Sequence, residues 1–384
     1  MSKNPYLNVN DNTPVLVGNS QLTDKRGIEG FNYLEILSEV SRKAILDCES
    51  PIKMEDHIDT VAVIRFVADT PHRDSATSNL WGYPNMPRSL SNSLNLSASN
   101  EIYTTTGGNS PQIALNELAN RIKDNQIECA LLAGGEALDT FVGRLKDGLE
   151  VNWEDNPGGE PEVIGKSTDG TNDHEKLHGL FDPSSVYPLF ANALRNKNGQ
   201  SIEEHMQDTG ELFESFSKVA SKNEYAWFPT HRSAAEIAEV KPENRMIGLP
   251  YTKYMNSIMR VNQSCAMVMM SAKKARALGI PESKWIFMYS GSCVNDIWNV
   301  SNRIDYCSSP AIKACTDGVL NLANISVDQI DFIDLYSCFP SAVQIAMKEL
   351  SLKKDDPRGL TVTGGLPYFG GPGNAYVMNS IATM

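Results

Sequence analysis

The stretch TTTGGNSPQIALNELANRI, from Thr104 to Ile122, is the part of this sequence that decides the expected fold. Its two glycines free the backbone, Ser110 is a residue type that caps helices, and Pro111 suits a first helical turn. Apolar side chains follow with helical spacing, at Leu115, Leu118, Ala119 and Ile122. Because a helix start presents unpaired N–H groups, which favour an anion or a reacting nucleophile, this loop is a candidate site.

Length and composition fit a globular protein built from two or three structural units. The chain has 384 residues, of which 41% are hydrophobic and 21% are charged. No apolar run is long enough to span a bilayer, and the first residues lack the apolar core of a signal peptide. A formal net charge of −13 argues against a general nucleic-acid or membrane-surface binder. We therefore expect a cytoplasmic protein with no nucleic-acid partner and no membrane insertion.

The cysteine pattern indicates free thiols. The chain has seven cysteines and no CxxC pair, and a chain of this size needs no disulfides to fold. Their positions are Cys48, Cys129, Cys265, Cys293, Cys307, Cys315 and Cys338. We expect all seven to be reduced.

Strands alternate with helices in the first part of the chain. The patterns predict strands over 13–20, 57–65 and 128–136, and helices over 32–48 and 110–122. Such alternation is typical of a parallel sheet with helices on both faces, which makes the fold class α/β.

A second series of the same kind begins near residue 284. It predicts strands over 284–292 and 330–339, helices over 308–325 and 340–350, and a glycine-rich segment over 361–374. The segment MEDHIDTVAV from Met54 matches SVDQIDFIDL from Ser326, with a D-x-I-D in register. This local match and the shared order of elements favour an internal duplication.

These features predict three domains. The first half comprises 12–140 together with 251–282, and the strand and helix over 261–280 complete it. Residues 141–250 are polar and form an inserted loop domain. Residues 283–384 are the second half. The helix predicted in GNAYVMNSIATM stops at Met384 with no following strand, so we expect the chain to be truncated relative to the natural protein.

This order of elements resembles the thiolase superfamily. The residues that carry the resemblance are TTTGGNSPQIAL, AGGEAL, VNQSCAMVMMSAKKARALGI, DLYSCFP and GGLPYFGGPGNAY. Together they are similar to the sterol-carrier-protein-type thiolases, often labelled acetyl-CoA acetyltransferases. The resemblance implies a duplicated αβαβα five-layered core with an inserted loop domain. It also implies a coenzyme A thioester as substrate or ligand, with no separate cofactor.

The resemblance also implies where the catalytic groups of a thiolase would lie. The nucleophilic cysteine corresponds to Gly108, or to Gly107 with one gap, and neither has a reactive side chain. The catalytic histidine corresponds to Gly371, and a further family cysteine would lie beyond Met384. Ser110 is close to the nucleophile position, but we expect its hydroxyl to cap the helix.

The family motif that holds the thioester oxygen corresponds to YSCF. Tyr336 takes the place of its Asn or His and is a candidate oxyanion donor. Cys338 is the one thiol that the resemblance places near the pocket, either as a nucleophile or as a packing residue. The expected substrate-binding residues are Gly107, Gly108, Asn109, Ser110, Gly370, Gly371 and Asn374. Contacts to coenzyme A from the inserted domain have as candidates Lys218, Lys222, His231, Arg232 and Ser233.

Two functions remain open at this stage. One is an acyltransferase that acts on CoA thioesters through Tyr336, backbone N–H groups near Gly108, and Cys338. The other is a non-catalytic CoA-ester binder or partner subunit. The labels of the resembling family favour the acyltransferase, whereas the replacement of the usual nucleophile and base by glycine favours the binder. The expected partners are an acyl-CoA molecule and either a second copy, as a homodimer, or another protein.

A zinc peptidase is a further alternative. HEKLH fits the H-E-x-x-H signature, in which His174 and His178 would bind zinc beside a Glu175 base. Glu203 or Glu204 would serve as the third ligand by spacing. Nearby glycines and a proline argue against the stable helix that this motif needs.

Overall fold

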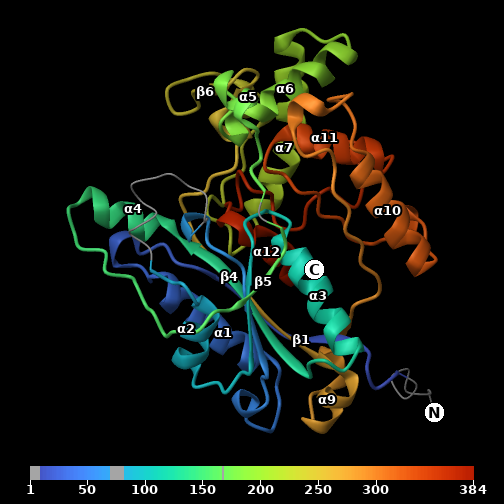
Figure 1. The fold of residues 1–384 in the computed structure, drawn as a ribbon. Helices are drawn as coiled ribbons and strands as arrows, with labels where there is room; N and C mark the ends of the chain where they lie inside the picture. The colour runs from blue at the N-terminus through green and yellow to red at the C-terminus, as the bar shows by residue number, and fades with distance from the viewer. Residues whose placement is uncertain (1–8, 70–81, 167) are drawn as a thin grey trace. The chain divides into compact units, whose positions relative to one another are not determined.

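The computed structural model describes residues 9–69, 82–166 and 168–384. Its chain divides into two compact units (Figure 1). Unit 1 comprises Met1–Ser167, Arg260–Tyr289 and Pro372–Ala382. Unit 2 comprises Thr168–Met259, Ser290–Gly371 and Thr383–Met384. The predicted duplication and its boundaries near residues 141, 251 and 283 remain a prediction.

Unit 1 is built on a seven-stranded sheet with the order β5-β3-β2-β4-β8-β1-β9. The strands are β1 (Pro14–Thr23), β2 (Thr60–Val63), β3 (Asn100–Thr104), β4 (Cys129–Ala137), β5 (Glu162–Ile164), β8 (Asn262–Ser271) and β9 (Ile286–Phe287). The four strands from β5 to β4 are parallel, whereas β8 pairs antiparallel with both β4 and β1. The expectation of a parallel sheet thus holds for only four neighbouring strands. Neighbouring parallel strands need a crossover connection, which is usually a helix. The chain instead reaches β8 from a long segment of unit 2, and β8 pairs antiparallel with its neighbours.

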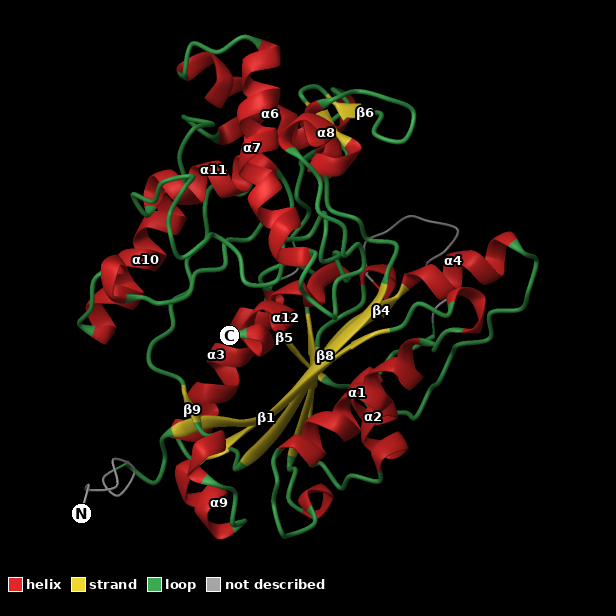
Figure 2. Ribbon diagram, turned by 180° about the vertical axis from the view of Figure 1, so that it is seen from behind, coloured by secondary structure: helices red, strands yellow, loops and turns green. Residues whose placement is uncertain are grey.

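Helices cover both faces of this sheet, as the sequence predicts (Figure 2). The unit 1 helices are α1 (Tyr33–Asp47), α2 (Met86–Leu94), α3 (Ser110–Lys123), α4 (Leu138–Lys146), α9 (Ala272–Ala277) and α12 (Tyr376–Thr383). Side chains of β4 alternate between two apolar clusters: Leu131 and Ala133 pack with α1 and α2, while Ala130 and Leu132 pack with α3 and α12. The two-residue period of a strand therefore places α3 against one complete face of the sheet.

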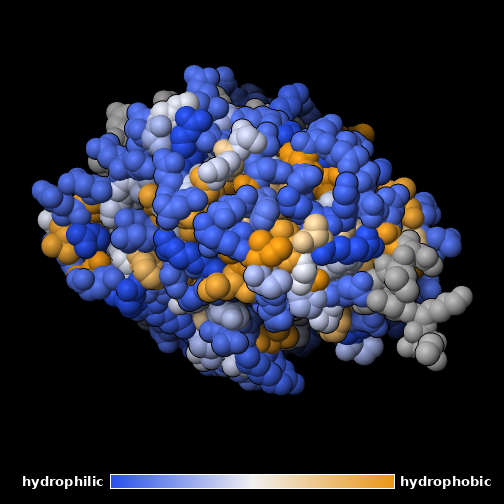
Figure 3. Space-filling view, turned by 90° about the horizontal axis from the view of Figure 1, so that it is seen from below, coloured by the Kyte–Doolittle hydropathy of each residue, from blue (hydrophilic) through white to orange (hydrophobic). Residues whose placement is uncertain are grey.

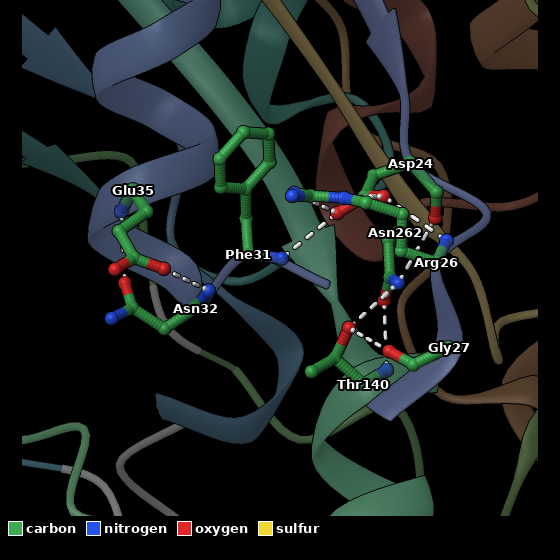
Figure 4. Close-up of polar contacts among 8 residues, drawn as sticks. All are labelled: Asp24, Arg26, Gly27, Phe31, Asn32, Glu35, Thr140 and Asn262. Atoms are coloured by element: carbon green, nitrogen blue, oxygen red, sulfur yellow. Dashed lines mark hydrogen bonds and ion pairs between the residues drawn. The ribbon is translucent and has the colours of Figure 1, made fainter. Parts of the chain in front are cut away.

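The connection from β1 to α1 is held by a buried polar network (Figure 4). The Asp24 carboxylate accepts hydrogen bonds from Arg26 Nε at 2.8 Å and from the backbone N–H of Phe31 at 2.8 Å. Asn262 Nδ2 donates to the Asp24 carbonyl and to Thr140 Oγ1. Because these partners come from different elements, the network fixes the start of α1 against β8 and α4.

Unit 2 is mostly helical. It contains α5 (Asp173–Leu177), α6 (Pro183–Lys197), α7 (Ile202–Ala220), α8 (Ala234–Ala238), α10 (Pro310–Ala323), α11 (Pro340–Glu349) and the two-stranded β6 (Met246–Gly248) and β7 (Tyr251–Thr252). Ser201 and Glu204 form a reciprocal capping box at the start of α7, which explains why this long helix begins there. The helices predicted at 308–325 and 340–350 are confirmed as α10 and α11.

The prediction of a strand over 330–339 is wrong. The segment is irregular, and Leu335 donates its backbone N–H to the Leu360 carbonyl at 2.9 Å rather than to a strand. A strand exists only with a hydrogen-bonded neighbour, and no described residue pairs with this segment in that way. The strand predicted over 284–292 shortens to β9, which pairs antiparallel with β1.

One face of the molecular surface is mainly polar. The face in Figure 3 is mainly hydrophilic, with apolar side chains in small separate groups. Within the part of the chain that the structure describes, every helix is too short or too polar to span a bilayer.

Candidate functional site

The glycine loop of unit 1 joins β3 to α3. Ser110 is the first residue of α3 and Asn109 is its N-cap, without a side-chain capping bond. The expectation that Ser110 caps the helix is therefore wrong: its buried hydroxyl turns back and donates to the Thr105 carbonyl at 2.8 Å. Since that hydroxyl is engaged inside the loop, Ser110 is poorly suited to act as a nucleophile.

The Asn374 side chain links this loop to the segment after β2 through two hydrogen bonds. Its Oδ1 accepts the backbone N–H of Gly107 at 3.0 Å, and its Nδ2 donates to the Arg65 carbonyl at 2.8 Å. The amide is buried, so both bonds are shielded from water. The structure thus brings together two predicted site residues, Gly107 and Asn374, that are 267 positions apart in the chain.

The remaining donors of the glycine loop are backbone groups. The N–H of Gly107 is used by Asn374, whereas the N–H groups of Gly108 and Asn109 donate to no residue in the described part of the chain. Gly108 is half-buried and Asn109 is exposed. Two adjacent donors at a helix start are suited to bind a carbonyl oxygen or an anion.

Arg65 also contacts the end of β3, the strand that leads into the loop. Its Nε donates to the Thr104 carbonyl at 2.8 Å, and its guanidinium lies 3.9 Å from the Tyr103 ring centroid. Asp69 accepts from both Arg65 and the Tyr103 hydroxyl, the latter at 2.7 Å. Burial raises the pKa of Asp69, and these two donors oppose that shift. The signal that sequence reasoning missed is that Arg65 lies two residues after the end of β2, at the sheet edge where the glycine loop also lies.

Unit 2 holds the other predicted catalytic residues. Tyr336 is half-buried, and Cys338 lies two residues before α11, whose N-cap is Phe339. Burial raises the pKa of the Cys338 thiol to about 11, although hydrogen bonds from Tyr187 and the Phe339 backbone lower it. The thiol is therefore almost fully protonated near pH 7, which makes it a weak nucleophile in this state.

Two tyrosine rings pack against Phe339, the residue after Cys338. The Tyr187 ring stacks on Phe339 with centroids 4.3 Å apart and planes 12° apart. Tyr251 lies on the same phenylalanine at 5.9 Å, and its hydroxyl accepts the backbone N–H of Ser341 at 3.2 Å. No sequence pattern indicated these tyrosines, because they come from α6 and β7, far from Cys338 in the chain.

Gly370 and Gly371 directly follow a turn over 366–369 in unit 2. Gly370 has φ +115°, a conformation that favours glycine, and Gly371 donates its N–H to the Ile258 carbonyl at 2.9 Å. A Cβ at Gly371 would collide with Ser257 Oγ. The space where a histidine side chain would begin is thus occupied by Ser257.

The zinc-peptidase alternative does not fit this geometry. The ring centroids of His174 and His178 are 4.5 Å apart, but His178 Nδ1 lies 2.9 Å from the His174 carbonyl. Glu175 is buried and accepts backbone N–H groups from Asn172 and Ser301. A carboxylate used in this way is not placed as a general base. Across the described residues, no group of three metal-ligating side chains is suitably placed, Glu203 and Glu204 included.

Of the candidate coenzyme A contacts in unit 2, three interact with other side chains or cap a helix, and two form no ion pair with a described residue. His231 pairs with Glu214 at 3.4 Å, Arg232 lies over the Tyr254 ring, and Ser233 caps α8. Lys218 and Lys222 are exposed and form no ion pair with a described residue. These two lysines are therefore the available cations of the predicted set.

Comparison with known proteins identifies relatives of the whole fold. No family model matches the chain. A curated acetyl-CoA acetyltransferase from Methanocaldococcus jannaschii is 23% identical over 188 residues, 49% of this chain and 45% of that protein. The chain therefore matches less than half the length of this curated relative.

Two solved structures are similar throughout the chain. The dimeric peroxisomal thiolase of Saccharomyces cerevisiae superposes with a TM-score of 0.66 at 14% identity, covering 99% of this chain and 92% of that one. This likeness shows the thiolase fold. A monomeric SCP2-thiolase-like protein type 1 from Mycobacterium smegmatis superposes with a TM-score of 0.80 at 33% identity, covering 98% of this chain and 71% of that one. The chain therefore belongs to the thiolase superfamily, among its SCP2-thiolase-like proteins.

Proposed function

We propose that the protein binds coenzyme A thioesters at the glycine loop without forming a covalent intermediate there. The observation that carries this proposal is the pair of available N–H groups at Gly108 and Asn109, in a loop that Asn374 holds in place. A thioester carbonyl oxygen is the kind of acceptor that such donors bind. The acetyl-CoA acetyltransferase name of the curated relative supports this ligand class.

The side chains argue against thiolase chemistry in this chain. A covalent thiolase step needs a thiolate at the loop and a base near it. Glycine at 107 and 108 supplies no thiolate, and Ser257 occupies the space beside Gly371. Losing both groups together removes the covalent route while leaving the backbone donors that bind the ester.

Acyl transfer through Cys338 is the second candidate function. It is favoured by the position of Cys338 beside the start of α11. Tyr336 would serve as the oxyanion donor in this mechanism. The main difficulty of this mechanism is the raised pKa of the Cys338 thiol, because of which turnover would be slow near neutral pH.

Calorimetric titration with acetyl-CoA and with free CoA tests the main proposal. We expect binding of acetyl-CoA that weakens in an Asn109→Pro variant, because proline removes one of the two available backbone N–H groups of the loop. Asn109→Ala, which keeps that N–H group, is the matched control. No binding of any acyl-CoA at high micromolar concentration would contradict the proposal.

Thiolysis and condensation assays separate the two functions. We expect no turnover above background in the wild-type protein at pH 7.5. Turnover that is abolished by Cys338→Ala would instead establish the acyltransferase.

We also propose a cytoplasmic location and an assembly with a second copy or another protein. Seven free cysteines support a reducing compartment. The two thiolase-fold structures compared above are described as monomeric and dimeric, so light scattering at several concentrations is the direct test of self-association.

A further inference from the structure

Glu136 is a buried carboxylate at the carboxyl end of β4, outside the set of predicted site residues. It belongs to the AGGEAL stretch, and its exposed fraction is 1%. Burying a carboxylate is costly unless hydrogen bonds compensate for the lost water, so its partners indicate what it holds in place. In an open α/β sheet, ligands bind outside the carboxyl ends of the parallel strands, which is where this carboxylate lies.

One partner of Glu136 is the segment that follows β2. Its Oε1 accepts the backbone N–H of Val67 at 2.8 Å. Since β2 and β4 are parallel neighbours, the chain leaves both strands at the same edge of the sheet. Val67 lies two residues after Arg65, whose carbonyl accepts a hydrogen bond from Asn374. The carboxylate therefore holds the segment to which the Asn374 amide is bonded.

The other neighbour of Glu136 is the turn that carries Asn374. Gly373 lies so close that a Cβ added to it would overlap both Glu136 Oε1 and Val67 Cγ2. Its φ of +53° is a conformation that also favours glycine. The residue directly before Asn374 is thus packed against the hydrogen bond between Glu136 and Val67.

A second residue of the same strand end contacts both segments. A Cβ added to Gly134 would lie 2.9 Å from Ile64 Cβ, in the segment after β2, and 3.0 Å from Ala375 Cβ, in the turn. Gly134 and Glu136 are two positions apart, so they lie on the same face of β4. This face of the strand end is therefore the support for the two segments that the Asn374 side chain joins.

We propose that Glu136 is a positioning residue for the candidate site, because it fixes the segments on both sides of the Asn374 amide. Asn374 in turn accepts the Gly107 N–H. Through that amide, the carboxylate sets the direction of the next two N–H donors of the glycine loop. All of these residues belong to unit 1.

This inference deepens the proposed function and rests on it for the identity of the site. The position of the loop, however, is measured without any ligand. Wild-type protein that binds no acetyl-CoA would refute the proposed function, whereas the exchange rates below would still decide the role of Glu136. The two failures are thus distinguishable.

The test is hydrogen exchange, followed by mass spectrometry on peptides that cover the glycine loop, in Glu136→Met and Glu136→Gln variants. Methionine has a similar length but is only a weak acceptor, whereas glutamine keeps a carbonyl oxygen for the Val67 N–H. Losing a hydrogen bond to a charged acceptor shifts a local opening equilibrium by about tenfold or more. We expect about tenfold faster loop exchange in Glu136→Met and close to wild-type exchange in Glu136→Gln.

A double-mutant cycle with Asn374→Ala shows whether the effect passes through the amide. We expect Glu136→Met to accelerate loop exchange by less than about twofold in the Asn374→Ala background, because coupled contributions are not additive in free energy. Glu175→Met is the matched control, since Glu175 is also a buried carboxylate that accepts a backbone N–H, but in unit 2. Its loop exchange should equal that of the wild type.

Three outcomes overturn the proposal: wild-type loop exchange in Glu136→Met, equally fast exchange in the glutamine and methionine variants, or independent effects in the cycle. Circular dichroism verifies that each variant folds. If Glu136→Met does not fold, Val67→Pro removes the donor of the same hydrogen bond and Val67→Ala keeps it. Equal loop exchange in those two variants likewise overturns the proposal.

Discussion

Among single residues, Asp24 shows how a buried charge contributes to stability. Burial raises its pKa, but the hydrogen bonds from Arg26 and Phe31 outweigh that effect and the net pKa is below 3.8. We expect Asp24→Asn to lower the free energy of unfolding by about 2 kcal/mol at pH 7, since buried donors lose a charged acceptor. Urea titration measures the change, and Asp173→Asn, whose side chain is fully exposed, is the neutral control.

The pH dependence of this contribution follows from the direction of the shift. A carboxyl group with a depressed folded-state pKa stabilises the protein above its unfolded pKa and loses that contribution as the pH falls through the folded value. The difference between wild type and Asp24→Asn should therefore be full at pH 6 and shrink below about pH 4. A constant difference across this range would contradict the assigned role.

Asn374 is the residue on which the glycine loop depends. We expect Asn374→Ala to lower the free energy of unfolding by about 2 kcal/mol and to weaken acetyl-CoA binding. The change removes the acceptor of the Gly107 N–H and the donor to the Arg65 carbonyl. Asn374→Asp separates the two contacts: it keeps the acceptor for Gly107 but has no donor for Arg65. Thermal unfolding and calorimetry provide both readouts, and an alanine variant equal to wild type in both would refute this role.

At the level of elements, β4 and β8 leave no room for a side chain at Gly135. A Cβ at Gly135 would lie 2.5 Å from Ser264 Cβ and 2.7 Å from the Gln263 carbonyl oxygen. We expect Gly135→Ala to lower the free energy of unfolding by about 1–3 kcal/mol, because two paired strands must separate. Gly170→Ala is the control, since no atom lies within 4 Å of its added Cβ. Equal denaturation midpoints for the two variants would rule out this packing constraint.

For the molecule as a whole, the two units differ in how deeply their elements are buried. All ten residues of β8 are buried, whereas Ala323 is the one buried residue of α10. Local opening is easiest where few apolar contacts must break. In hydrogen-exchange mass spectrometry we therefore expect α10 peptides to exchange orders of magnitude faster than β8 peptides. Similar protection of both elements would contradict this expectation.

The elements with a clear local pattern were predictable. The α3 helix starts at Ser110, and Leu115, Leu118 and Ile122 are buried as their spacing indicates. Capping by Ser110 was not predictable, because Asn109 and Ser110 are both plausible N-caps and only the path of the loop selects between them. The segment 330–339 has the composition of a strand, but composition supplies no hydrogen-bonded neighbour.

By itself the sequence determined helices α1, α3, α9, α10, α11 and α12, most strands of unit 1 and the membership of the thiolase superfamily, since these depend on local periodicity and on motifs of adjacent residues. The tertiary structure alone decided the antiparallel pairing of β8, the hydrogen bond from Gly107 to Asn374 and the stacking of Tyr187 on Phe339. Each of these joins residues distant in the chain. Local propensity carries no information about such pairs, because they form only when the packed core brings their elements together.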